Sequence, residues 1–276
     1  YKPKRLEKSR MDGLIMEQGT SSPYIANIYA SCGTAQVLEY SSKGTQLDLV
    51  KIARQAQHDP MKPIDKLKVL IHIASAITDL HDKGANHGDL RIDQFLFLEG
   101  VYKLNDFHIS AFLQQGADRQ TCLDDGHFSM GDILWHAPEQ KDGKEADLTL
   151  ADVFMMGNAM FNIYTKRWVY EGIKEQHALA LLYHGKYSEF PPTLDTTIPA
   201  NKAMQSAILK CWTQDPQQRP SAKSIRDSLL QELSSIVGRT VQADDNLLKI
   251  QIPPLPKYHT YSGSSMDNAN ENERKP

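Results

Sequence analysis

Several features that would place a protein in a special class are scarce or absent in this sequence. It has three cysteines, Cys32, Cys122 and Cys211, too far apart for a zinc or disulfide framework, so reduced thiols are expected. No apolar run approaches the roughly 20 residues of a membrane-spanning helix, and no signal peptide opens the chain. A net charge of −3 provides no basic surface for nucleic acid. We therefore expect a cytoplasmic protein, or the intracellular part of a longer one.

The most informative stretch is a predicted hairpin with an aspartate on each side. Residues 95–98 and 101–104 are short apolar runs, and the Glu-Gly pair at 99–100 is typical of a tight turn. A hairpin brings its two ends together, so Asp89 and Asp106 are predicted to lie close in space. Such carboxylates can hold a metal ion or share acid–base work. They can also be loop residues that cap turns.

The order of residues around this hairpin resembles the catalytic core of protein kinases, which reads His-Arg-Asp-Leu-x-x-x-Asn and, after a hairpin, Asp-Phe-Gly. Here residues 87–94 read His-Gly-Asp-Leu-Arg-Ile-Asp-Gln, and residues 106–108 read Asp-Phe-His. Both aspartates match the family pattern. Gly88, Gln94 and His108 depart from it.

Two later segments extend the resemblance. Residues 135–139, Trp-His-Ala-Pro-Glu, look like the Ala-Pro-Glu segment in the form common among tyrosine and related kinases. Residues 211–220 look like the Cys-Trp…Asp-Pro…Arg-Pro element of the same family. The resemblance implies a buried ion pair between Glu139 and Arg219. Small-molecule phosphotransferases of kinase-like fold generally lack this pair, so a protein kinase is favoured.

Apolar periodicity predicts four helices, at residues 4–19, 63–83, 149–164 and 221–233. The third is apolar almost all round, which indicates that it is buried. Asp152 lies in its first turn, where a carboxylate favours the helix dipole and is typical of an N-terminal cap. The resemblance implies another role for Asp152, in holding the backbone of the catalytic loop.

The first part of the chain resembles the small lobe of a kinase. Short β-rich runs at 24–30 and 36–40 precede a predicted helix at 46–55. The second run is similar to the hinge of tyrosine and tyrosine-kinase-like kinases, in which backbone groups after a gatekeeper residue hold adenine. Leu38 stands in the gatekeeper place. The resemblance thus implies an ATP site at Leu38, Glu39, Ser41 and Leu96.

The resemblance also assigns roles in catalysis, with ATP and Mg²⁺ as cofactors. Asp89 would be the base that orients the acceptor hydroxyl, and Arg91 would lie near the transferred phosphoryl group. Asp106 would chelate magnesium. Gln94 takes the place of the second metal ligand but is one methylene longer than Asn, so weaker binding of the second metal is expected. His108 lacks the backbone freedom of glycine and is expected to stiffen its segment rather than to bind metal.

Two further departures concern regulation and phosphate binding. Gly88 removes the arginine that grips a phosphorylated activation loop, so phosphorylation within residues 109–136, at Thr121 or Ser129, is not expected to be the switch. Asp12 falls where a helix glutamate of kinases pairs with the phosphate-binding lysine. An aspartate in a solvent-facing helix position is the alternative.

We therefore predict an α+β, protein-kinase-like fold: a partial small lobe at 1–44, a mostly helical large lobe at 45–237, and a polar, mostly disordered tail at 238–276. The predicted function is ATP- and Mg²⁺-dependent phosphoryl transfer to a Ser, Thr or Tyr hydroxyl of a protein substrate or signalling partner. The glycine-rich loop and the lysine-bearing strand are missing from the sequence, so impaired activity is expected. The alternative is a pseudokinase that acts as a binding or allosteric scaffold.

Overall fold

The computed structural model describes residues 3–45, 48, 50–51, 54, 59, 61–113, 133–142 and 147–252. Within these ranges there are six α-helices: α1 (Pro3–Gly19), α3 (Pro63–Asp82), α5 (Leu148–Thr165), α6 (Glu175–Tyr183), α7 (Pro199–Cys211) and α8 (Ala222–Val237). The strands are β1 (Ile28–Cys32), β2 (Ala35–Leu38), β3 (Ala85–Asn86), β4 (Phe95–Leu98), β5 (Val101–Leu104) and β6 (Ala111–Phe112). Short 3₁₀ turns are η1 (Ile92–Gln94), η2 (Pro138–Asp142), η3 (Pro216–Gln218) and η4 (Asn246–Leu248). The predicted helix-rich α+β class is confirmed.

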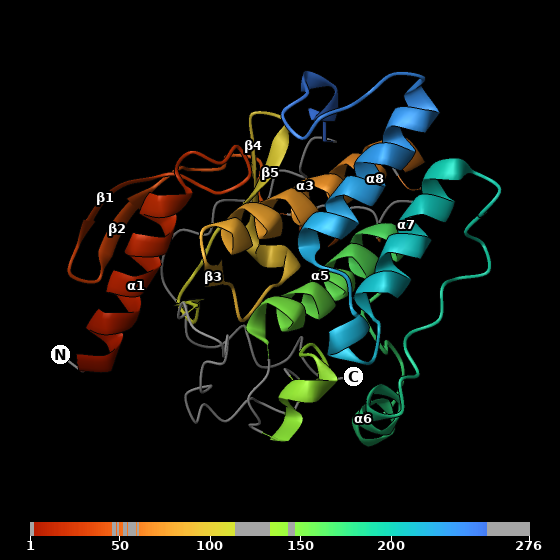
Figure 1. Cartoon of the computed structure of the whole chain (residues 1–276), viewed down its shortest axis with the longest axis horizontal. Helices are drawn as coiled ribbons and strands as arrows, with labels where there is room; N and C mark the ends of the chain where they lie inside the picture. The colour runs from red at the N-terminus through yellow and green to blue at the C-terminus, as the bar shows by residue number, and fades with distance from the viewer. Residues whose placement is uncertain are drawn as a thin grey trace.

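A small part of the molecule consists of α1 and the antiparallel pair β1–β2, which lie together at one side of the helical body (Figure 1). Gly33 allows the tight turn between the strands because its φ is +62°. Strand β1 overlaps the end of the run predicted at 24–30, and β2 overlaps most of the run predicted at 36–40. Tyr29 and Val37 are 67% and 58% exposed, so much of this two-stranded sheet faces solvent.

The larger part is organised around α5, in which every residue except Leu150 is buried. This confirms the burial predicted from its apolar sequence. The N-cap of α5 is Asp147, whose Oδ1 accepts the Thr149 N–H at 3.0 Å, so Asp152 is not the cap. Helix α3 contacts both α5 and α8, and α7 contacts α5 and α8, which together enclose the core (Figure 1).

The predicted hairpin is confirmed as β4–β5. Phe95 pairs with Leu104 and Leu98 with Val101. The two turn residues at 99–100 have φ values of 52° and 93°, which is the geometry of a two-residue hairpin turn. The pairing continues one residue beyond the strands at the open end of the hairpin, where the Asn105 N–H donates to the Gln94 carbonyl at 2.9 Å.

The chain after α8 packs back against the body. Leu248 is 1% exposed, and its carbonyl lies 3.0 Å from Nε2 of the buried His72 in α3. The Ile250 N–H donates to the Gly100 carbonyl at 2.8 Å, and the Tyr24 hydroxyl donates to the Ala243 carbonyl. The tail predicted to be mostly disordered from residue 238 is therefore ordered as far as residue 252, because its apolar side chains are buried.

Parts of three predictions lie outside the described residues. They are most of the helix at 46–55, the activation segment with Thr121 and Ser129, and the end of the tail at 253–276. None of the helices that the structure does describe is both long and apolar enough to cross a membrane.

Candidate functional site

The loop before the hairpin, residues 87–94, is held in place by Asp152, which is fully buried in α5. Its carboxylate accepts the N–H groups of His87 and Gly88 at 2.7 and 2.9 Å, and Nε2 of His81 lies 3.0 Å away. This is the backbone-holding role that the resemblance implied. Gly88 has a φ of +84°, and a Cβ there would lie 3.1 Å from the Ile109 carbonyl oxygen. Glycine at this position avoids the backbone strain and the close contact that a side chain would introduce.

Asp89 is held by groups of its own loop. Its N–H donates to Nδ1 of His87 at 3.4 Å, and its Oδ2 accepts a hydrogen bond from Nε2 of Gln94 at 3.4 Å. The Gln94 Oε1 in turn accepts the Arg91 N–H at 2.9 Å. Nε of Arg91 lies 3.6 Å from the Asp93 carboxylate, and both side chains are substantially exposed. The loop thus presents a carboxylate and a guanidinium group toward solvent-accessible space.

Asp106 follows the second strand of the hairpin by two residues, in the left-handed backbone region with a φ of 66°. Its Oδ1 is hydrogen-bonded to Nδ1 of His108, and the two side chains are 44% and 60% exposed. His108 itself has no positive φ, so it adopts its backbone conformation without strain. Its imidazole instead restrains Asp106 directly.

Asp12 is buried, with an exposed fraction of 1%, so the solvent-facing alternative is wrong. Its Oδ1 accepts the Phe107 N–H at 2.9 Å, which joins α1 to the segment of Asp106. Among the described residues, the only basic side chain within 4.0 Å of the Asp12 carboxylate is the imidazole of His108, with Nδ1 4.0 Å from Oδ2 of Asp12. The described residues therefore offer Asp12 a histidine contact in place of a lysine contact.

His87 and Phe107 connect the loop and the Asp106 segment through their rings. Both are fully buried, and their ring centroids lie 5.2 Å apart. Nε2 of His87 lies 3.3 Å from the Asn105 carbonyl oxygen. Burial lowers the pKa of His87, although the nearby Asp152 carboxylate opposes this. The His87 imidazole therefore packs between the Asp89 loop and the segment of Asp106.

The residues implied for adenine binding converge on β4. Leu38 and Leu96 are partly buried and apolar. The Ser41 hydroxyl donates to the Phe97 carbonyl at 2.8 Å, and Thr45 forms a β-bridge with Leu96. The segment after β2 is thereby placed beside β4.

The Glu39 side chain is used within the protein. Its two oxygens accept hydrogen bonds from Nζ of Lys103 at 2.9 and 3.0 Å, and the Asn27 N–H donates to it at 2.8 Å. Burial alone would raise the pKa of Glu39, but these donors outweigh burial and hold it below the ordinary value. The Glu39 N–H also donates to the Asn27 carbonyl at 3.0 Å, so the group that Glu39 could offer a nucleotide is its backbone carbonyl. The sequence prediction missed Lys103, for which the only signal is a lysine within an apolar strand, where a buried ammonium needs a carboxylate partner.

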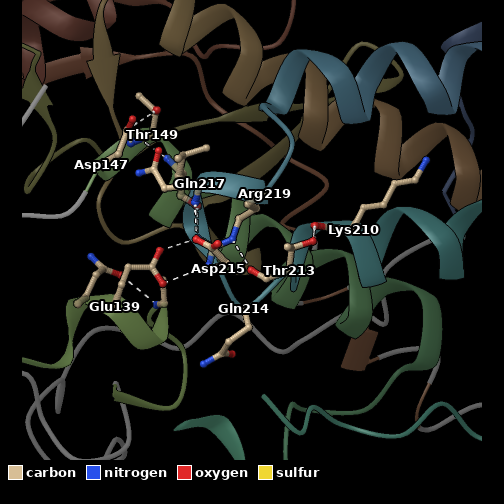
Figure 2. Close-up of polar contacts among 12 residues, drawn as sticks. Glu139, Asp147, Thr149, Lys210, Thr213, Gln214, Asp215, Gln217 and Arg219 are labelled. Atoms are coloured by element: carbon tan, nitrogen blue, oxygen red, sulfur yellow. Dashed lines mark hydrogen bonds and ion pairs between the residues drawn. The ribbon is translucent and has the colours of Figure 1, made fainter. Parts of the chain in front are cut away.

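The predicted ion pair between Glu139 and Arg219 is confirmed. The carboxylate is bidentate, with N–O distances of 2.6 and 3.1 Å. The fully buried guanidinium also donates to the carbonyls of Leu150 and Thr213 at 2.7 and 3.0 Å and lies over the Phe154 ring at 5.2 Å. Figure 2 shows Arg219, which lies in the turn between η3 and α8, beside Glu139 and Thr213. The pair joins η2 and the start of α5 to a turn that lies 69 to 80 residues later in the sequence.

Trp135 joins this network to the catalytic loop. Its indole N–H donates to the Leu90 carbonyl, and its own carbonyl accepts Nδ2 of Asn158 at 2.7 Å. Oδ1 of Asn158 in turn accepts the indole N–H of Trp212 at 2.7 Å. The segment 135–139 is thereby held against the loop that carries Asp89.

The described residues contain no cluster of three or more His, Cys, Asp or Glu side chains able to hold a metal ion unaided. Magnesium is nevertheless often bound by one or two carboxylates together with substrate phosphates. The exposed carboxylate of Asp106 fits that arrangement. The Gln94 amide oxygen is engaged by the Arg91 N–H.

Comparison with known proteins gives consistent matches. The family described as protein tyrosine and serine/threonine kinase matches residues 2–229. The chain is 24% identical over 211 residues to the serine/threonine-protein kinase mos of Xenopus laevis, a match covering 75% of this chain and 57% of that protein. It is 26% identical over 169 residues to a Wee1-like protein kinase of Oryza sativa subsp. japonica, covering 61% and 29%. It is 26% identical over 231 residues to the probable serine/threonine-protein kinase drkC of Dictyostelium discoideum, covering 80% and 28%. The chain thus spans 57% or less of the length of these relatives.

Proposed function

The chain belongs to the family of protein tyrosine and serine/threonine kinases, and from that membership we propose that it binds ATP with Mg²⁺ and phosphorylates a hydroxyl group of a protein. Its relatives named above include serine/threonine kinases, which favours serine or threonine as the acceptor. A cytoplasmic location and a protein partner in signalling belong to the same proposal.

One observation carries this proposal: two aspartates meet at the open end of a single hairpin. Asp89 is hydrogen-bonded to the Gln94 side chain, and the Gln94 carbonyl accepts the N–H of Asn105, the residue before Asp106. Neither carboxylate contributes to the buried core, and Asp106 is held in a left-handed backbone conformation that costs free energy. Such strain at an exposed carboxylate is typical of a functional site.

Each residue then has a defined task. Asp89 accepts the proton of the incoming hydroxyl, and Arg91 offsets negative charge on the transferred group. Asp106 provides the metal ligand, and bound Mg²⁺ would neutralise the phosphate oxygens. The apolar surfaces of Leu38 and Leu96 enclose the adenine base.

We further propose that transfer by this chain is slow. Asp12 contacts no lysine among the described residues, and the imidazole of His108 engages Asp106. Losing one preorganised electrostatic group typically costs about 10²–10³ in rate.

The second candidate function is a pseudokinase scaffold. The His108 contact with Asp106 and the exposed sheet β1–β2 favour it, because both can exist without catalysis. In that case the domain would bind a protein partner or act allosterically.

The first test is thermal stabilisation by ATP with and without Mg²⁺, compared between the wild-type chain and Asp106→Asn. We expect a shift that requires Mg²⁺ and disappears in the variant. Transfer of labelled phosphate to a generic protein substrate should then depend on Asp89, with Asp89→Asn as the inactive control. Absence of any shift at millimolar ATP would reject nucleotide binding and leave the scaffold function.

A further inference from the structure

Gln94 occupies the place of a metal ligand, but its amide is committed on both sides. We propose that Gln94 is a positioning residue for Asp89 and that the site binds one divalent cation, on Asp106. The inference rests on the proposed kinase function, and it names how that function is carried out in this chain.

The amide oxygen of Gln94 is used by the backbone. Gln94 is the third residue of the 3₁₀ turn η1, and its Oε1 accepts the N–H of Arg91, the residue before the turn, at 2.9 Å. Glutamine and glutamate favour this position because their side chains are long enough to reach back three residues. Turning the oxygen toward a metal would leave the Arg91 N–H without this acceptor. Gln94 is 8% exposed, so water would replace the lost bond poorly.

The amide nitrogen faces Asp89. Nε2 donates to Oδ2 of Asp89 at 3.4 Å, while His87 receives the Asp89 N–H on the other side. An amide N–H cannot bind a cation, and next to a carboxylate it is a hydrogen-bond donor. The residue that should present oxygen to a metal therefore presents hydrogen to the catalytic base.

Glutamine is one methylene longer than the asparagine of the kinase pattern, and this length explains why Gln94 bonds to the backbone and to Asp89 and not to a metal. An asparagine at position 94 would be too short to reach the Arg91 N–H in this way, which would leave its oxygen available for a metal. Magnesium demands near-ideal geometry, so a displaced and already bonded oxygen is a poor second-site ligand. Asp106 is exposed and remains the carboxylate suited to a cation.

The metal count is measured with Mn²⁺, which is paramagnetic, in the presence of a saturating non-hydrolysable ATP analogue. Electron paramagnetic resonance and calorimetry should give one bound Mn²⁺ per chain. Gln94→Leu should give the same count and the same affinity, and Asp106→Asn should abolish binding.

The reaction separates the two roles further, because Gln94→Glu keeps an oxygen for a metal and for the Arg91 N–H but loses the donor to Asp89. If residue 94 acts as a metal ligand, the Gln94→Glu variant should be at least as active as the wild type. If residue 94 positions Asp89, Gln94→Glu should lose activity as Gln94→Leu does, with a fall in kcat of about 10- to 100-fold and an unchanged KM for ATP. Gln140→Leu is the matched control, since Oε1 of Gln140 accepts the Ala137 N–H at 3.0 Å in a similar turn of another segment. It should keep kcat.

The outcomes are distinguishable. Two bound Mn²⁺ ions, one of them lost in Gln94→Leu, would overturn the inference and leave the proposed function standing. A normal kcat in Gln94→Glu would also overturn it, as would the absence of phosphoryl transfer by a wild-type chain that binds one ion. Absence of any nucleotide-dependent Mn²⁺ would reject the proposed function itself, and the inference with it.

Discussion

At the scale of single residues, three buried charged side chains have specific partners. Lys103 meets Glu39, and Arg219 meets Glu139. Asp152 accepts two backbone N–H groups. A buried ion requires such partners because its desolvation is otherwise uncompensated. These contacts hold the loop, the hinge and the segment 135–139 in fixed relative positions.

The pair at Glu139 gives a direct prediction. Glu139→Ala leaves the guanidinium of Arg219 buried without its carboxylate, so the free energy of unfolding should fall by about 3–5 kcal/mol. Denaturant unfolding measures this loss. A double variant, Glu139→Leu with Arg219→Met, should recover part of it, because no uncompensated charge remains.

The control for this prediction is the exposed pair of Arg54 and Glu171, whose side chains are 37% and 36% exposed. Arg54→Gln should cost less than about 1 kcal/mol. Equal losses at the buried and the exposed pair would contradict the account.

At the scale of elements, the segment after α8, residues 238–252, connects three parts of the structure. It bonds to the Gly100 carbonyl of the hairpin, to His72 of α3 and to Tyr24 before β1. These three places belong to different parts of the chain. The segment therefore couples the position of the hairpin, whose open end carries the site, to the helical body.

Leu248 tests this coupling. Leu248→Ala should lower the free energy of unfolding by about 2–5 kcal/mol, because it creates a cavity at a fully buried site. Amide hydrogen exchange at Ile250 should also become faster, since its bond to Gly100 depends on the packed segment. The neighbouring Leu247 is only partly buried, so Leu247→Ala is the matched control and should have a smaller effect. Unchanged exchange in Leu248→Ala would show that the segment is not held by this side chain.

At the scale of the whole molecule, two buried histidines link stability to pH. His72 and His87 are both fully buried. Burial lowers the pKa of His72 to about 4 and also lowers that of His87. In the unfolded chain these imidazoles return to an ordinary pKa near 6.5. As the pH falls below that value, the unfolded chain takes up protons that the folded chain does not, so the fold loses stability.

We therefore expect the free energy of unfolding to fall by about 2 kcal/mol between pH 7 and pH 5 through His72 alone. His72→Gln should remove this part, because glutamine does not titrate. Its amide can still accept the Tyr102 N–H and donate to the Leu248 carbonyl, as His72 does in the wild type. Denaturation curves at several pH values provide the measurement. An identical pH dependence in the variant would refute the role of His72.

Local signals in the sequence were enough for much of the architecture. Apolar periodicity located α3 and α5 within one or two residues, because a helix that packs into the core must repeat its apolar positions. The Glu-Gly pair fixed the hairpin turn, since few residues adopt positive φ. The family motifs predicted the ion pair of Glu139 and Arg219, whose two members lie 80 residues apart.

The sequence by itself determined helices α1, α3, α5 and α8, the hairpin and the family of this protein, because each is written in short-range patterns or in motif order. It did not predict α6 and α7. Only the tertiary structure decided which way polar side chains point. It turned Asp12 inward to the Phe107 N–H, bound the amide of Gln94 to Arg91 and Asp89, and folded the tail onto His72. These contacts depend on where distant or adjacent backbone groups come to lie in space. No local pattern records that position, since the same residue types would suit an exposed helix, a metal site or a disordered tail equally well.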